Sequence, residues 1–106
     1  FKGCEEFWAL YTNNSGMLIL KSQVGTGNGA NVMVDFRKLT SQAIGCNATR
    51  VILCHNHPGG SRMPSQEDII LTQNIKNMMG FINVSVVEHI IIAGDSYFSF
   101  VENHIL

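Results

Sequence analysis

Basic residues are few in this sequence, and they do not gather in any one stretch. Only seven of the 106 residues are Lys or Arg, and the formal net charge is −1. Proteins that bind nucleic acid usually carry a cluster of basic residues, because neutralising phosphate charge supplies most of the affinity. We therefore expect no nucleic-acid surface on this domain and no DNA binding by the domain alone.

Cysteines and long apolar runs are also scarce. Cys4, Cys46 and Cys54 form no CxxC pair, so the sequence indicates neither a thiolate zinc site nor a disulfide framework. No apolar run approaches the length of a membrane span, and no signal peptide is visible. We expect a cytoplasmic protein that has no membrane partner.

What the sequence does have is apolar material for one small core. Hydrophobic residues make up 45% of the chain and charged residues 14%, which is typical of a folded globular domain rather than a disordered one. We find no repeats, linkers or low-complexity segments. The length fits one domain, and we expect it to fill residues 1–106.

The apolar pattern predicts a mixed α/β fold. Strands are expected at 7–11, 17–20, 32–34, 51–54, 84–93 and 97–101, with a glycine-rich loop at 24–31. Asp35 and Ser65 are placed to begin two helices, which Gly45 and Gly80 would end. The apolar helix faces are expected at Phe36, Leu39, Ala43, Ile44, Ile70, Leu71, Ile75, Met78 and Met79. The order predicts a mixed sheet with flanking helices, an α/β sandwich.

Two histidines mark the end of the buried strand at 51–54. His55 and His57 are one residue apart, so strand alternation sends both imidazoles to the same face. Asp68 follows in the first turn of the next predicted helix. Two histidines and one carboxylate would leave a tetrahedral zinc ion with one open position, as in catalytic sites. An HxH pair by itself is more often a pair of polar loop residues.

Several neighbouring residues have structural interpretations as well. Ser65-x-x-Asp68 resembles a helix capping box, which is compatible with a functional role because a capped helix holds Asp68 rigidly. Alternation points Cys54 to the face opposite His55, where it would be a core cysteine. His89 is interpreted as a hydrogen-bonded structural histidine rather than a further ligand.

His55-Asn56-His57-Pro58-Gly59-Gly60, followed by Pro64-Ser65-Gln66-Glu67-Asp68, resembles the HNHPSG…PSxxD signature of RadC-like proteins. Glu5-Glu6-Phe7-Trp8, Val34-Asp35-Phe36-Arg37 and Glu88-His89-Ile90-Ile91-Ile92 resemble further family motifs. The resemblance covers nearly all of the chain. It implies a JAMM-type (MPN+) metal-binding domain with a cytidine-deaminase-like α/β sandwich.

The resemblance also implies roles for individual residues. His55, His57 and Asp68 match the metal ligands, and Ser65 matches the serine that binds the developing oxyanion. Glu5 matches the glutamate that takes a proton from the metal-bound water. Glu5 is preferred to Glu6 because of the family's E-x-F-W opening, since the two side chains lie on opposite strand faces.

Three features depart from the family pattern. Gly59 stands where many relatives have Ser, and Glu88 replaces the usual Asp. The helix-hairpin-helix module that often accompanies this domain, a DNA-binding element, does not occur in these residues. The traditional association of the family with DNA repair therefore finds no support in this sequence.

These observations lead to two hypotheses about function. The first is a zinc-dependent metallohydrolase that cleaves an amide bond of a peptide or protein substrate. His and carboxylate ligands also accept Mn, Fe or Co. The alternative is a non-catalytic metal-binding or DNA-associated scaffold domain. The full set of Glu5, His55, His57, Ser65 and Asp68 favours the hydrolase, because a scaffold has no need of all five.

Overall fold

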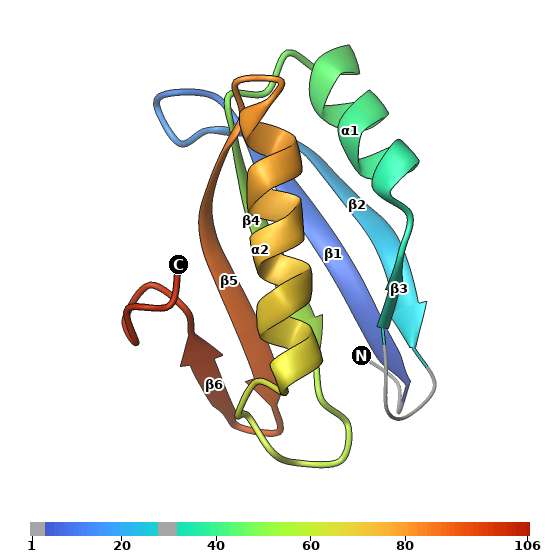
Figure 1. Cartoon of the computed structure of the whole chain (residues 1–106), viewed down its shortest axis with the longest axis vertical. Helices are drawn as coiled ribbons and strands as arrows, with labels where there is room; N and C mark the ends of the chain where they lie inside the picture. The colour runs from blue at the N-terminus through green and yellow to red at the C-terminus, as the bar shows by residue number, and fades with distance from the viewer. Residues whose placement is uncertain (1–3, 28–31) are drawn as a thin grey trace.

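A six-stranded mixed sheet forms the body of the molecule in the computed structural model, which describes residues 4–27 and 32–106 (Figure 1). Its elements are β1 (Glu5–Thr12), β2 (Leu18–Gly27), β3 (Val32–Val34), α1 (Phe36–Gly45), β4 (Arg50–Asn56), α2 (Gln66–Gly80), β5 (Ser85–Ala93) and β6 (Ser96–Ser99). The strand order is β3-β2-β1-β4-β5-β6. Among the strands of these described residues, only β4 and β5 run parallel to each other, and α2 makes the crossover that a parallel pair needs. The predicted α/β fold with a mixed sheet is confirmed.

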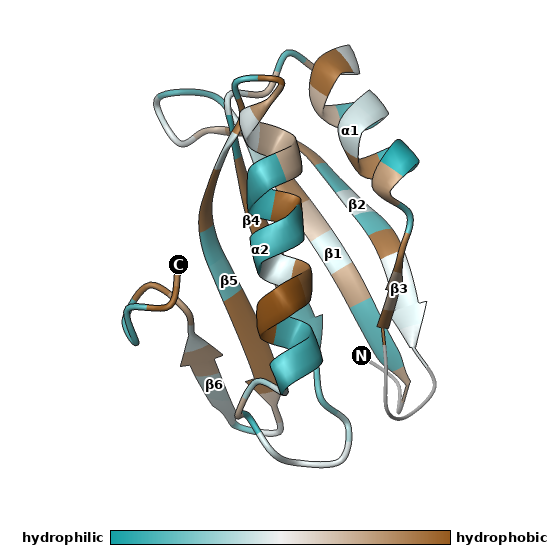
Figure 2. Cartoon of the chain, in the orientation of Figure 1, coloured by the Kyte–Doolittle hydropathy of each residue, from teal (hydrophilic) through white to brown (hydrophobic). Residues whose placement is uncertain are grey.

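Both helices pack on the same face of the sheet (Figure 1). On that face, alternate residues of β1 (Phe7, Ala9 and Tyr11) are fully buried. They share one core with Leu39 of α1 and Ile75 of α2. The Tyr11 hydroxyl donates a hydrogen bond to the Leu39 carbonyl, 3.1 Å away, which joins α1 to the sheet. Much of the outward side of α2 is hydrophilic (teal in Figure 2).

The helix boundaries follow the predicted caps. Asp35 accepts a hydrogen bond from the Lys38 amide at 3.0 Å, and Ser65 begins α2 with a capping box. The predicted apolar faces were partly wrong, because Phe36, Ile44 and Ile70 are exposed. The face that α2 turns to the sheet is formed by Asp68, Thr72, Ile75 and Met79. Its first two positions are polar, and hydrophobicity alone could not assign them to the interior.

The predicted glycine-rich loop was wrong over residues 24–27, which complete strand β2; residues 28–31 lie outside the described part. Gly25 permits the strand to continue. A Cβ at this position would lie 2.6 Å from the carbonyl oxygen of Met33 and 3.2 Å from the Cβ of Phe7. The β1–β2 register also shifts between Phe7 and Trp8. Gly25 therefore marks a close approach of backbones beside an irregularity, rather than a turn.

The other face of the sheet carries the alternate residues of the same strands. Trp8, Leu10, Ile52, Cys54 and Ile90 are half-buried there. Cys54 is thus opposite His55 as predicted, but it is not in the core. Within residues 4–27 and 32–106, no helix is long and apolar enough to cross a membrane. The last strand, predicted at 97–101, ends at Ser99.

Candidate metal centre

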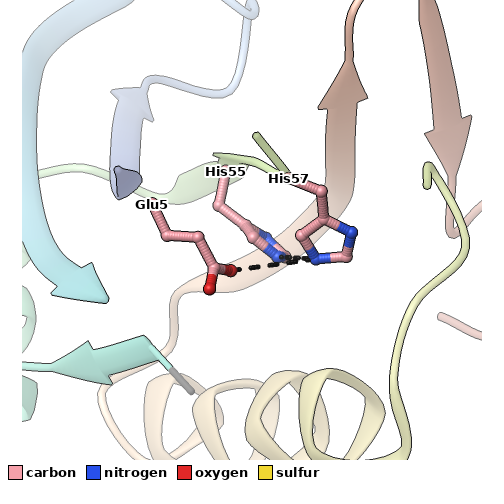
Figure 3. A group of neighbouring side chains, drawn as sticks. All are labelled: Glu5, His55 and His57. Atoms are coloured by element: carbon pink, nitrogen blue, oxygen red, sulfur yellow. Dashed lines mark hydrogen bonds and ion pairs between the residues drawn. The ribbon is translucent and has the colours of Figure 1, made fainter. Parts of the chain in front are cut away.

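The candidate site lies where β1 and β4 meet the first turn of α2. The β1–β4 ladder pairs Phe7 with His55, and the same antiparallel register continued by two residues would put Glu5 opposite His57. Alternation then directs Glu5, His55 and His57 to the helix-covered face. Figure 3 shows these three side chains converging from the two strands. Asp68 reaches the same place from the first turn of α2.

Four side chains bring their polar atoms to one point. The Nε2 atoms of His55 and His57 are 3.0 Å apart. The carboxylate of Asp68 lies 3.5 Å from Nε2 of His55, through Oδ1, and 3.1 Å from Nε2 of His57, through Oδ2. Glu5 is slightly farther away, with Oε1 3.9 Å from Nε2 of His57. Glu5, His55 and His57 form a group that could hold a metal ion, with ligand atoms all within 4.8 Å of one another.

The spacing of these atoms fits a small divalent cation. Four ligands arranged tetrahedrally at about 2.0–2.1 Å from an ion lie about 3.3 Å from one another. The shortest separations among His55, His57 and Asp68 are 3.0, 3.1 and 3.5 Å, and the last two involve different oxygens of the Asp68 carboxylate. The 3.9 Å between Glu5 and His57 is longer than this spacing. The closest set is therefore two imidazoles and the Asp68 carboxylate, with Glu5 beside them.

The environment of His57 indicates which of its nitrogens is free. Its Nδ1 lies 2.8 Å from the carbonyl oxygen of Ser61. A carbonyl only accepts, so Nδ1 carries a proton and donates it, and Nε2 is the ring nitrogen that faces the site. Histidines that bind a metal ion through one ring nitrogen commonly donate the other in this way. The His57 side chain is 17% exposed, so the site is reached from solvent on this side.

His55 is buried between an aromatic ring and a second histidine. Phe7 stacks on its ring with centroids 5.3 Å apart, and its Nδ1 lies 2.7 Å from Nε2 of His89. Phe100 stacks on His89 with centroids 4.3 Å apart. Burial, followed by the neighbouring His55, lowers the pKa of His89 well below 6.5, so His89 is neutral at physiological pH. The prediction that His89 is a hydrogen-bonded structural histidine agrees with these contacts.

Asp68 and Ser65 are coupled through the capping box. The Asp68 amide donates to Oγ of Ser65 at 3.0 Å, and the Ser65 amide donates to Oδ2 of Asp68 at 2.8 Å. Burial would raise the pKa of Asp68, but the hydrogen bonds from His55 and the Ser65 amide, with the electrostatic effect of both histidines, outweigh it. The net effect lowers the pKa, so Asp68 is ionised and suited to bind a cation.

Glu5 and Glu6 take opposite sides of the strand, as alternation predicts. Glu5 is 5% exposed and faces the histidines, whereas Glu6 accepts a hydrogen bond from the Trp8 indole at 2.9 Å on the other face. Asn56, which no sequence pattern singled out, holds the backbone on both sides of Glu5. Its Oδ1 accepts from the Glu6 amide at 2.6 Å, and its Nδ2 donates to the Cys4 carbonyl at 2.9 Å.

Glu88, the residue that departs from the family pattern, lies away from the site. Its carboxylate accepts hydrogen bonds from the Ser99 hydroxyl at 2.7 Å and from the Val101 amide at 3.1 Å. It therefore anchors the end of β6. Gly59, the other departure, lies in the exposed loop after His57, where an added Cβ would meet no atom within 4 Å.

A family model described as RadC-like JAB domain matches residues 1–105. The chain belongs to this family. Among relatives of this RadC-like domain, the UPF0758 protein of Flavobacterium johnsoniae is 42% identical over 101 residues, which cover 95% of this chain and 44% of that protein. The UPF0758 protein YeeS of Escherichia coli is 36% identical over 102 residues, covering 96% of this chain and 69% of that protein.

The UPF0758 protein of Histophilus somni is similar at 41% identity over 103 residues, 95% of this chain and 46% of that protein. The RadC-like domain thus spans less than half the length of the Flavobacterium and Histophilus relatives. The expected membership of the RadC-like family is confirmed over nearly the whole chain.

Proposed function

We propose that this RadC-like domain is a zinc-dependent hydrolase that cleaves an amide bond, in a peptide or an isopeptide linkage, of a substrate met in the cytoplasm. The observation that supports it best is the convergence of His55, His57 and Asp68 at tetrahedral spacing, with the Glu5 carboxylate next to them. Three protein ligands leave a fourth position open, which is the pattern of catalytic rather than structural zinc sites.

Each residue of the site has a chemical task in this proposal. His55, His57 and Asp68 would hold zinc, which when bound would lower the pKa of a coordinated water towards neutrality and polarise the substrate carbonyl. Glu5 would accept the proton of the attacking water and later pass it to the leaving nitrogen. Ser65 would donate a hydrogen bond from its hydroxyl group to the developing oxyanion. Its oxygen already accepts from the Asp68 amide, but its proton is free for this task.

The alternative, a scaffold that keeps a metal site without catalysis, explains less of the geometry. A scaffold needs the three ligands only. Glu5 is almost completely buried and ionisable, and burying a carboxylate is unfavourable unless a cation or hydrogen bonds compensate. Its place beside the ligands is what a general base requires. A non-catalytic scaffold would use the Glu5 carboxylate only as a further metal ligand, although it lies farther from His57 than Asp68 does.

The metal assignment is tested by removing single ligands. Purified protein should bind about one zinc per chain, and His57→Ala or Asp68→Asn should lower the zinc affinity by at least about tenfold, because two protein ligands rarely hold zinc well. Isothermal titration with Zn, Mn and Co salts measures this. His104→Ala is the matched control, since His104 is an exposed histidine in the turn after β6. Equal affinities in all three variants would contradict the site.

Catalysis is tested at Glu5. Glu5→Gln should keep the zinc, since the side chain lies outside the closest ligand set, but should lower amide or isopeptide hydrolysis by at least about a hundredfold. Glu6→Gln is the matched control on the opposite strand face and should change little. Hydrolysis of a panel of fluorogenic peptide and isopeptide substrates gives the readout. A Glu5→Gln variant as active as the parent would favour the scaffold.

A further inference from the structure

Asn56 lies between the two histidines of the candidate metal centre and directs its side chain to β1. The residue is buried, with only 4% of its surface exposed. Its Oδ1 accepts a hydrogen bond from the Glu6 amide at 2.6 Å, and its Nδ2 donates one to the Cys4 carbonyl at 2.9 Å. Those two backbone groups come just after and just before Glu5 in the chain. One side chain of β4 therefore bridges the backbone segment that carries Glu5.

The two partners fix the orientation of this carboxamide. A backbone N–H only donates and a backbone carbonyl only accepts, so the amide oxygen faces Glu6 and the amide nitrogen faces Cys4. An inverted amide would place Nδ2 against an N–H group and Oδ1 against a carbonyl oxygen, and both hydrogen bonds would be lost. The bridge involves no titratable group, so its direction does not depend on a protonation state.

This bridge lies where the backbone pairing of β1 with β4 ends. The last pair of that ladder is Phe7 with His55. Beyond it, the described residues of β1 pair with β2 alone, where Glu5 lies opposite Gly27. The chain of β4 is still held on its other side there, because Asn56 pairs with β5. The Asn56 carboxamide thus offers the end of β1 a donor and an acceptor on the side where the backbone ladder with β4 has stopped.

The carboxylate of Glu5 depends on this backbone segment for its position. Within residues 4–27 and 32–106 it makes no hydrogen bond, and its Oε1 lies 3.9 Å from Nε2 of His57. The imidazole of His57, by contrast, is held by its own contact with the Ser61 carbonyl at 2.8 Å. If the end of β1 moved away from β4, the Glu5 carboxylate would move with it while the imidazole stayed. A displacement of about 1 Å in a catalytic group can lower a rate by about a hundredfold.

We propose that Asn56 is a positioning residue that holds the end of β1 against β4 and so keeps the Glu5 carboxylate beside the candidate metal centre. The inference rests on the proposed function for the role of Glu5 as the general base. Asn56 acts through Glu5, because its carboxamide is occupied by the backbone of β1. Its own backbone joins His55 to His57. A single residue therefore sets the distance between the base and the two histidine ligands.

The first test measures the bridge in the metal-free protein, without substrate. Amide hydrogen exchange followed by NMR reports the protection of the Glu6 N–H group. Asn56→Ala should speed exchange at Glu6 by at least about tenfold, while the amides of Trp8 and Leu10, farther along β1, should change by less than about threefold. Asn103→Ala is the matched control, because it also removes an asparagine that donates to a backbone carbonyl, that of Ser99 at 2.8 Å. Unchanged exchange at Glu6 in Asn56→Ala would overturn the proposal.

The second test asks whether Asn56 acts through Glu5. Hydrolysis is measured for zinc-loaded Asn56→Ala, Glu5→Gln and the double variant. Asn56→Ala should lower kcat by at least about tenfold and leave KM and the zinc affinity within about threefold of the parent. The double variant should be no slower than Glu5→Gln alone, because a misplaced base cannot be lost twice. If the two losses multiply instead, Asn56 acts independently of Glu5 and the proposal is wrong.

A crystal structure of the variant separates this inference from the hydrolase proposal. If Glu5→Gln hydrolyses its substrate as fast as the parent, the hydrolase proposal fails, whereas the position of the Glu5 carboxylate still tests the bridge. In Asn56→Ala we expect that carboxylate to lie about 1 Å or more from its place beside His57.

Asn56→Asp serves the same purpose if Asn56→Ala does not fold. It keeps an acceptor for the Glu6 amide but sets an oxygen against the Cys4 carbonyl, so the Glu5 carboxylate should again be displaced. A Glu5 carboxylate that stays in place in the folded variant would overturn the inference, even if hydrolysis were lost.

Discussion

The carboxylate of Asp68 caps a helix and also faces the candidate metal centre. One of its oxygens, Oδ2, accepts the Ser65 amide at 2.8 Å and lies 3.1 Å from Nε2 of His57. The capping box therefore fixes the rotamer of this candidate ligand without any ion. Capping and metal binding are not competing explanations of the Ser-x-x-Asp pattern, because the first prepares the geometry of the second.

Substitutions of Ser65 can separate its two tasks. Ser65→Ala loses both the cap and the hydroxyl, so it should lower the free energy of unfolding by about 0.5–2 kcal/mol and turnover by about a hundredfold. Ser65→Asp keeps a capping oxygen but has no hydroxyl proton, so stability should be nearly retained while turnover falls. Urea unfolding and hydrolysis assays on zinc-loaded protein measure the two effects. Full turnover in Ser65→Asp would leave capping as the only role of Ser65.

The residues assigned to the candidate site from the sequence were predictable because they follow short-range rules and lie in motifs that resemble those of a known family. Alternation placed His55 and His57 on one face and separated Glu5 from Glu6, and helix-start chemistry placed Asp68 in a first turn. The choice of Glu5 over Glu6 came from the resemblance. Asn56, Thr72 and His89 could not be assigned in this way. Asn56 contacts residues at the other end of the chain, and the partners of His89 lie on β4 and α2. Such contacts are known only when the strands are paired.

At the level of elements, β2 shows why a glycine-rich stretch is ambiguous. Gly25 and Gly27 resemble a loop in the sequence, and the loop prediction was wrong because the same residue type also serves where backbones approach closely. The distinguishing information lies in β3 and β1, whose Met33 and Phe7 atoms occupy the space a side chain would need. The prediction of the apolar helix faces was partly wrong for a related reason, because residue type alone does not show which side chains meet the sheet. In α2, Asp68 and Thr72 are buried while Ile70 is exposed.

Gly25→Ala tests this account of β2. The added Cβ would meet the Met33 carbonyl oxygen at 2.6 Å, a backbone contact that cannot move cheaply, so we expect a loss of about 1–3 kcal/mol in the free energy of unfolding. Gly59→Ala is the matched control, because its Cβ meets nothing within 4 Å and should change stability by less than about 0.5 kcal/mol. Chemical denaturation of both variants measures the difference. Equal stabilities would show that β2 shifts without cost.

At the scale of the whole molecule, the candidate site lies where β1, β4 and α2 meet, and these elements are otherwise held together by apolar packing. The core beneath the helices runs from Met79 and Val86 at one end to Phe7 at the other. At that second end, polar residues replace apolar ones on β1, β4 and α2 together. In the absence of a cation, the Nε2 atoms of His55 and His57 and the carboxylates of Asp68 and Glu5 face one another at 3.0–3.9 Å. Burying several polar groups together is unfavourable unless each has a compensating partner, which a bound cation would supply.

Zinc should therefore stabilise the whole domain rather than a loop. A ligand that binds only the folded state at 100 times its dissociation constant adds about 2.7 kcal/mol to the free energy of unfolding. For a domain of this size, that corresponds to a rise of about 10 °C or more in the melting temperature. The single ion would link His55 and His57 at the end of β4 to Asp68 at the start of α2, so the strand and the helix should unfold in one transition.

Calorimetry of the metal-free protein, with and without zinc, measures this shift, and His57→Ala supplies the control. The variant removes one ligand from the partly exposed side of the site, so its core should be intact while its zinc-induced shift falls to a small fraction of that of the parent. The same rise in both proteins would mean that zinc stabilises the fold from somewhere else. If the melting temperature rises in neither protein at zinc concentrations well above micromolar, the contact between β4 and α2 is stable without a cation. His55, His57 and Asp68 would then not be zinc ligands.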